Sequence, residues 1–61
     1  METVKVIIVD CVENKSWYKD LRGKKFHVYG TMDKPILYNN EYLTCVENSA
    51  SIHIKDVIFI R

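Results

Sequence analysis

The chain has 61 residues, of which 48% are hydrophobic and 28% are charged, and its formal net charge at pH 7 is +1. This length predicts one domain over residues 1–61, without room for a buried active-site cleft, and the balanced charge argues against nucleic-acid binding driven by the whole protein. No segment approaches the roughly 20 apolar residues that cross a bilayer. Two cysteines make no disulfide scaffold and no signal peptide is visible, so we expect a cytoplasmic protein with reduced thiols.

The first strand is expected to begin at Val4 and to extend as far as Val12. Five of the six residues from Val4 to Val9 are β-branched and apolar, which is typical of a strand covered on both faces or closing on itself. Residues 16–23 predict one short helical turn inside a long loop, because Ser16 suits an N-cap and Gly23 suits a left-handed position after a helix.

The rest of the chain consists of short extended segments separated by turn residues. Residues 25–30 alternate, with Phe26 and Val28 on one face and His27 and Tyr29 on the other. Further extended segments are expected at residues 36–38, 42–46, 51–54 and 57–60. Short strands without a true helix predict an all-β fold, and specifically a small five-stranded barrel. Its expected core is Val4, Val6, Ile8, Leu21, Phe26, Val28, Leu43, Ile52, Ile54, Val57 and Phe59.

The order of these elements resembles that of small SH3-like barrel proteins encoded by bacteriophages and their Gram-positive, Bacillus-like hosts. The residues that carry the resemblance are Trp17-Tyr18, Leu21, Gly23, Phe26-His27-Val28 and the segment 52–57. The resemblance implies an SH3-like barrel with a 3₁₀-like turn before the last strand. It also implies a function in binding host machinery such as RNA polymerase. Residues 31–40 depart from the pattern, because they are longer than the usual link before the third strand.

The residues that could carry metal or covalent chemistry are scattered. Cys11, His27, Cys45 and His53 are separated by 16, 18 and 8 positions, whereas zinc ligands commonly occur in pairs about two to four residues apart. A Cys/His nucleophile pair would also need a cleft. Gly23 and Gly30 are the only glycines, so no phosphate-binding loop is present. We expect no catalytic residue, no metal, no cofactor and no enzymatic activity.

The candidate partner-binding segment is residues 15–26, which hold the only tryptophan and five basic residues against one acid. The local charge is +4, while the other 49 residues sum to −3. Tryptophan, tyrosine and arginine are the residues enriched at interface hot spots. The candidate partner-binding residues are Trp17, Tyr18, Lys19, Arg22, Lys24 and Lys25.

Two interpretations of this segment remain open from the sequence. In one it is a solvated loop in which Trp17 and Leu21 cap the barrel. In the other its aromatic and basic side chains contact an acidic surface of a partner. We expect Leu21 and Phe26 inside, with Tyr18 and the basic residues outside. The apolar residues 35–38 form a second candidate surface, if they do not enter the core as a strand.

Two functions follow from these features. The first is a non-enzymatic, phage-encoded protein-interaction module, a monomer or weak homodimer, that binds and modulates or inhibits a larger host protein with an acidic surface, such as RNA polymerase. The alternative is a nucleic-acid-binding barrel that stacks bases on Trp17, Tyr18 or Tyr29 beside the lysines. A sequence pI of about 7.8 disfavours the alternative.

Overall fold

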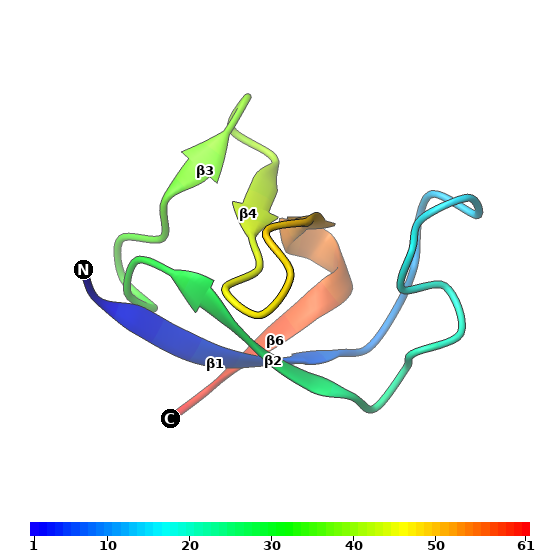
Figure 1. Ribbon diagram of the computed structural model, residues 1–61, viewed down its shortest axis with the longest axis horizontal. Coiled ribbons are helices and arrows are strands. Elements are labelled where there is room, and N and C mark those ends of the chain that lie inside the picture. Colours follow the sequence, from blue (N-terminus) through cyan, green and yellow to red (C-terminus); the bar gives the residue numbers. More distant parts are fainter.

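The computed structural model describes all residues from Met1 to Arg61 and is built of short strands (Figure 1). The elements are β1 (Thr3–Ile8), β2 (Lys25–Tyr29), β3 (Leu37–Tyr38), β4 (Tyr42–Thr44), β5 (Ser51–His53), the 3₁₀ helix η1 (Ile54–Asp56) and β6 (Val57–Ile60). They form two three-stranded antiparallel sheets, the first ordered β2-β1-β6 and the second β3-β4-β5. β5 and β6 do not pair, so the sheets do not close into a barrel. No helix has the length and apolar character needed to cross a membrane.

The two sheets are joined through β2. Val28 forms an isolated bridge with Cys45, and the Val46 N–H donates to the His27 carbonyl at 2.8 Å. Continuous pairing would place Gly30 opposite Leu43, but Leu37 occupies that position. Residues 30–36 therefore leave the sheet as an excursion, and β2 and β3 are two parts of one interrupted strand along β4. The predicted count of five strands is wrong for this reason, and the excursion coincides with the unusually long link noted in the sequence.

The excursion depends on Gly30, which is buried and has a φ of +103°. Gly30 forms an isolated bridge with Pro35, and the Ile36 N–H donates to the Tyr29 carbonyl at 3.3 Å, so the two ends of the excursion meet. A Cβ on Gly30 would lie 2.6 Å from the Ile36 backbone nitrogen. A side chain is therefore excluded by both backbone conformation and space.

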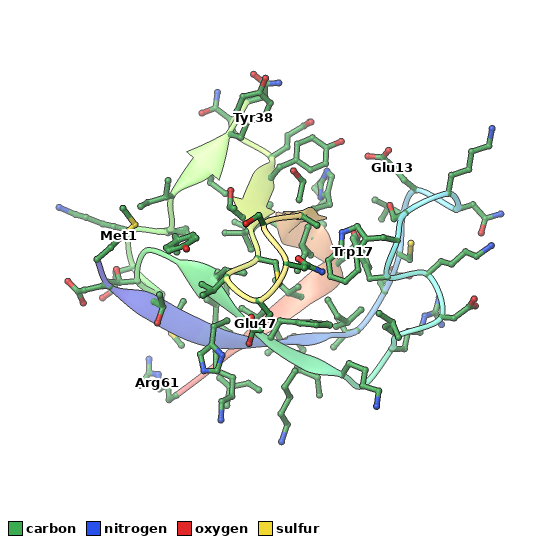
Figure 2. The ribbon with its side chains drawn as sticks, in the orientation of Figure 1. Met1, Glu13, Trp17, Tyr38, Glu47 and Arg61 are labelled. Atoms are coloured by element: carbon green, nitrogen blue, oxygen red, sulfur yellow. The ribbon has the colours of Figure 1, made fainter.

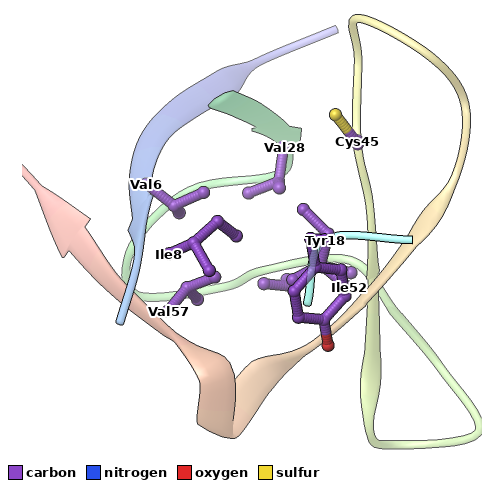
Figure 3. Close-up of a cluster of buried hydrophobic side chains, with 8 residues drawn as sticks. Val6, Ile8, Tyr18, Val28, Cys45, Ile52 and Val57 are labelled. Atoms are coloured by element: carbon purple, nitrogen blue, oxygen red, sulfur yellow. The ribbon is translucent and has the colours of Figure 1, made fainter. Parts of the chain in front are cut away.

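The core lies between the two sheets and agrees closely with the sequence prediction (Figure 3). All eleven expected core residues are buried or packed against the buried cluster. The buried cluster is Val6, Ile8, Tyr18, Val28, Leu43, Cys45, Ile52 and Val57. The prediction missed two of these eight residues, Tyr18 and Cys45.

The long loop between β1 and β2, residues 9–24, contains no helix, so the predicted helical turn at residues 16–23 is wrong. It is instead a series of tight turns, with hydrogen bonds from Ser16 to Glu13, from Lys19 to Ser16, from Leu21 to Tyr18 and from Lys24 to Leu21. So short a segment cannot offset the cost of helix nucleation. The only 3₁₀ helix is η1, at the position that the resemblance implied.

The sequence also predicts a first strand that reaches Val12, but β1 ends at Ile8. The N–H groups of Val9 and Asp10 both turn to the carbonyl of Asp56, at 2.8 and 3.3 Å, so the chain leaves the sheet here. The loop returns where the Gly23 N–H donates to the Ile8 carbonyl at 2.7 Å. Both ends of the loop are thus fixed to the first sheet.

The two glycines give a matched test of the excursion. Gly23 also has a positive φ, of +87°, but a Cβ there would meet nothing within 4 Å. Gly23→Ala should reduce the free energy of unfolding by about 1–2 kcal/mol, from backbone strain alone. Gly30→Ala should cost clearly more, because the added methyl group also displaces the backbone of residues 34–36. Urea unfolding of both variants checks this, and equal losses would contradict it.

Candidate functional site

A buried carboxylate, that of Asp56, organises the long loop. Asp56 is 0% exposed, and its Oδ2 atom accepts a hydrogen bond from the hydroxyl of Tyr18, which is itself only 2% exposed. The other oxygen, Oδ1, accepts from the Val12 N–H at 3.1 Å. The Tyr18 hydroxyl in turn accepts from the His53 N–H at 3.1 Å. One polar cluster therefore joins η1, β5 and the loop.

The local structure of η1 turns Asp56 inward. The 3₁₀ helix begins after His53, whose Nδ1 accepts from the Lys55 N–H at 3.1 Å and caps it. Burial and the neighbouring Asp56 raise the pKa of Tyr18 to about 12. The Tyr18 hydroxyl therefore keeps its proton at physiological pH and remains a donor to the carboxylate.

The loop also covers the free edge of β5. Alternate residues of an antiparallel strand point their backbone groups to the partner strand. The Ile54 N–H donates to the Glu41 carbonyl at 2.8 Å, so Ile54 and Ile52 point their backbone groups toward β4. The backbone groups of Ser51 and His53, which alternate with them, therefore point away from β4. The Trp17 Nε1–H donates to the Ser51 carbonyl at 2.9 Å, and the Tyr18 hydroxyl accepts a hydrogen bond from the His53 N–H. Two aromatic side chains thus take the place of a neighbouring strand.

Trp17 has features of both interpretations that the sequence left open, a residue that caps the core and a residue that is exposed for contact with a partner. Its indole packs edge-on against Tyr18 and against Phe26, with ring centroids 5.3 Å apart in both pairs. It is nevertheless 38% exposed, and Figure 2 shows it pointing from the loop toward the body of the protein. Trp17 therefore anchors the loop and still presents part of its surface to solvent.

The basic residues of the loop are exposed, as the sequence predicts, and most have no acidic partner. Arg22 Nη2 lies 3.3 Å from Asp10 Oδ1 in an exposed ion pair. No salt bridge involves the four lysines of the basic segment, which are Lys15, Lys19 and Lys24 in the loop and Lys25 at the start of β2. His27 Nδ1 also lies 2.8 Å from Glu47 Oε2 in a hydrogen bond, and the hydrogen bonds from His27 lower the pKa of Glu47 to about 2.

The expectation that Tyr18 lies outside is wrong. Its ring is part of the buried cluster in Figure 3, so it cannot be a contact residue for a partner. Asp56 was missed as well, because Lys55-Asp56 reads as a polar break between two strands. A buried acid cannot be recognised from its neighbours in sequence when its partner, Tyr18, lies 38 residues away.

The second candidate surface, residues 35–38, is partly a strand that enters the core and partly an exposed apolar surface. Leu37 packs against the core, whereas Ile36 and Tyr38 are exposed. Tyr38 begins a row of rings across the second sheet, since it pairs with Tyr42 and Tyr42 pairs with His53. The Tyr42 hydroxyl donates to Glu13 Oε1 at 2.5 Å, a contact that raises the pKa of Tyr42.

The residues considered for metal or covalent chemistry do not come together. Cys11 and Cys45 are both free thiols, and no three His, Cys, Asp or Glu side chains lie close enough to hold a metal ion. Burial raises the pKa of the Cys45 thiol. One open hollow of about 390 Å³ lies beside the excursion, lined by Met1, Glu2, Gly30, Thr31, Lys34 and Ile36. It contains no histidine or cysteine.

Comparisons with protein-family models, with curated proteins and with solved structures found no match.

Removal of the Tyr18 hydroxyl tests the buried cluster. Tyr18→Phe leaves the Asp56 carboxylate and the His53 N–H without their partner, so we expect a loss of about 1–3 kcal/mol in the free energy of unfolding. Tyr42→Phe is the control, because its hydroxyl bonds an exposed glutamate, and it should cost under about 1 kcal/mol. Urea unfolding at neutral pH measures both, and equal losses would show that the cluster has no special role.

Alkaline titration tests the same hydroxyl. The pKa of Tyr18 is about 12 in the folded protein, against an ordinary value of 10.0. Its contribution to stability is therefore complete below pH 10 and decreases as the pH rises toward 12, because the unfolded chain ionises first. The phenolate absorbance of the wild type minus that of Tyr18→Phe should show a midpoint near pH 12. A midpoint at the ordinary value would contradict the buried hydrogen bond.

The two thiols should differ in reactivity. Cys45 is fully buried with a raised pKa, whereas Cys11 is partly exposed, and the thiolate is the reactive form. An alkylating reagent in excess should modify Cys11 first, and Cys45 should react only at the rate of unfolding. Peptide mass mapping after timed quenching measures this, and equal rates would be inconsistent with a buried Cys45.

Proposed function

We propose that this protein is a non-enzymatic protein-interaction module with an SH3-like arrangement of strands, whose basic loop binds an acidic surface of a larger protein. The succession β6-β1-β2-β4-β5, linked across the sheets at Val28 and Cys45, supports that arrangement. A long loop after the first strand and a 3₁₀ turn before the last strand support it further. In this proposal the two sheets are the walls of a partly open barrel.

The observation that carries the proposal is a fixed loop with free positive charge. Trp17, Tyr18 and Asp56 hold the loop by hydrogen bonds to β5 and η1, while the three lysines of the loop and Lys25 at the start of β2 have no ionic partner. A loop that is ordered before binding loses less conformational entropy when a partner docks. Exposed unpaired charges increase the rate of association with a surface of opposite sign. Tyr18 serves here as an anchor, and Trp17, Lys19, Arg22, Lys24 and Lys25 remain contact candidates.

The resemblance to phage and Bacillus-like barrel proteins supports a host protein as the partner, in the host cytoplasm. RNA polymerase is the first candidate, because the resemblance implies binding to host machinery and the proposed contact needs an acidic surface.

Nucleic-acid binding is the second candidate function. The row of Tyr38, Tyr42 and His53 across the second sheet favours it, because rings at the surface can stack on bases, although only Tyr38 is exposed and the other two are half-buried. Glu13 is bonded to Tyr42 within this row, and Glu41 lies beside it in sequence. Negative charge at the rings repels phosphate, so this face supports protein binding better than nucleic-acid binding.

Charge reversal in the loop tests the proposed function. Lys24→Glu with Lys25→Glu should slow association with purified RNA polymerase from a Bacillus-like bacterium by about tenfold at low salt, and flatten its salt dependence. Lys34→Glu with Lys55→Glu is the matched control, since it changes the net charge equally but outside the loop. Biolayer interferometry measures both rates.

The outcomes separate the candidate functions. Equal slowing by both double variants would show that only overall charge matters. Failure of the wild type to bind the polymerase would remove it as the partner. Tight binding of single-stranded RNA or duplex DNA with a steep salt dependence would favour the second function instead.

A further inference from the structure

We propose that the free edge of β6 binds an extended acidic segment of the partner protein, which pairs with β6 as an added strand of the first sheet. This proposal rests on the proposed function, because it assumes an acidic protein partner. It extends that function from the loop to a defined sheet edge and to a defined kind of ligand. Strand addition is an established mode of peptide recognition, in which backbone hydrogen bonds supply affinity.

The backbone of β6 points half of its polar groups away from the sheet. β6 is the last strand of the first sheet and pairs only with β1. The Val9 N–H donates to the Asp56 carbonyl, so every second residue after Asp56 points its backbone groups toward β1. Ile58 and Ile60 therefore face β1, whereas Val57 and Phe59 direct their N–H and C=O groups outward. No side chain, turn or loop bonds to these groups.

The contrast with β5 shows that this open edge is unusual within the molecule. β5 and β6 are the two ends of the strand succession, and the edge of β5 is covered by Trp17 and Tyr18. Uncovered edges are sites where another chain pairs, and proteins usually cover or blunt them. In this protein one end is covered by its own loop and the other is left available.

The side chains next to the open edge select the occupant. The outward positions of the first sheet are Thr3, Lys5, Ile7, Lys25, His27, Tyr29, Ile58 and Ile60. Their fixed charges are two lysines, and Arg61 follows at the end of β6. The one acid that reaches this face, Glu47, is bonded to His27 on β2, the strand farthest from β6. Ile58 is 58% exposed. An apolar residue beside Ile58 and an acidic residue beside Ile60 would match this face.

The register brings the charges within reach. Lys5 lies directly opposite Ile60 on β1, and an added strand would lie about 10 Å from β1, within the combined length of a lysine and a glutamate side chain. A second copy of this chain fits less well. Pairing two β6 edges would join two faces whose strands β1 and β6 carry Lys5 and no acid, so neither copy offers an acidic side chain to the other and charge complementarity is lacking.

A synthetic peptide with the repeat valine-threonine-glutamate-threonine is the probe, because residues two apart share one face of a strand and valine and glutamate then lie on the same face. The same peptide with lysine in place of glutamate is its control. Amide hydrogen exchange of the full chain should slow at Val57 and Phe59 when the glutamate peptide is added, but not with the lysine peptide. Ile58→Glu should weaken binding of the glutamate peptide at least about tenfold, whereas Ile58→Lys should retain it. Both substitutions are at an exposed position, so the fold should survive, and the exchange pattern of the core checks this.

Several results would overturn the proposal. One is equal binding of both peptides, and another is slowed exchange at residues 36–38 instead of β6. A third is concentration-dependent protection of Val57 and Phe59 without peptide, which would indicate a second copy at this edge. Variants on RNA polymerase separate the two proposals if the loop variant is Lys19→Glu with Lys24→Glu, because neither lysine lies on the face of the first sheet. Loss of binding with this loop variant but not with Ile58→Glu would overturn the β6 site alone. Loss with Ile58→Glu but not with the loop variant would support the β6 site and contradict the loop.

Discussion

The hydrogen bond between Tyr18 and Asp56 is the contact on which the rest of the structure depends. A carboxylate that is fully buried must be satisfied, because an unpaired charge in the interior is very costly. Asp56 meets this requirement with the Tyr18 hydroxyl and the Val12 N–H, both supplied by the long loop. The loop is therefore fixed by the need to pair one acid.

Fixing the loop has consequences for both ends of the strand succession. The chain segment that carries Tyr18 also places Trp17 over the free edge of β5, where the indole N–H satisfies the Ser51 carbonyl. η1, which holds Asp56, turns the chain directly into β6. The same few residues thus cover the free edge of β5 and set the position at which β6, the opposite edge strand, starts. A domain of this size buries a smaller fraction of its unfolded surface than a larger domain does. Residues that serve two structural roles at once therefore matter for its stability.

The two proposed contact regions meet on the outer face of the first sheet. Lys25 ends the basic segment and pairs in register with Ile7, and Ile7 pairs with Ile58 on the edge strand. A partner that is first attracted by the loop lysines could therefore extend across this sheet to the edge without leaving the same face. The aromatic row of the second sheet belongs to a different surface, beside the acidic side chain of Glu13 (Figure 2).

The sequence determined the features that depend on short-range patterns. Alternation of apolar residues placed the strands and the core, because each strand shows its buried face with a period of two. Exposure of the loop lysines also followed, since isolated lysines are rarely buried. The excursion at residues 30–36 was visible only as a long link, because the need for glycine at position 30 arises from backbone of residues 34–36 that folds against it.

Only the tertiary structure decided the roles of Tyr18 and Asp56. From its neighbours in sequence, each of the two residues is expected at the surface. Each is stable in the interior only because the other is there to form the hydrogen bond. The open edge of β6 and the covered edge of β5 were likewise invisible, because an edge is defined by which strand is absent beside it. Pattern along the chain thus fixes which side chains are apolar and where they alternate. Pairing between distant segments fixes which polar groups are buried and which backbone groups stay free.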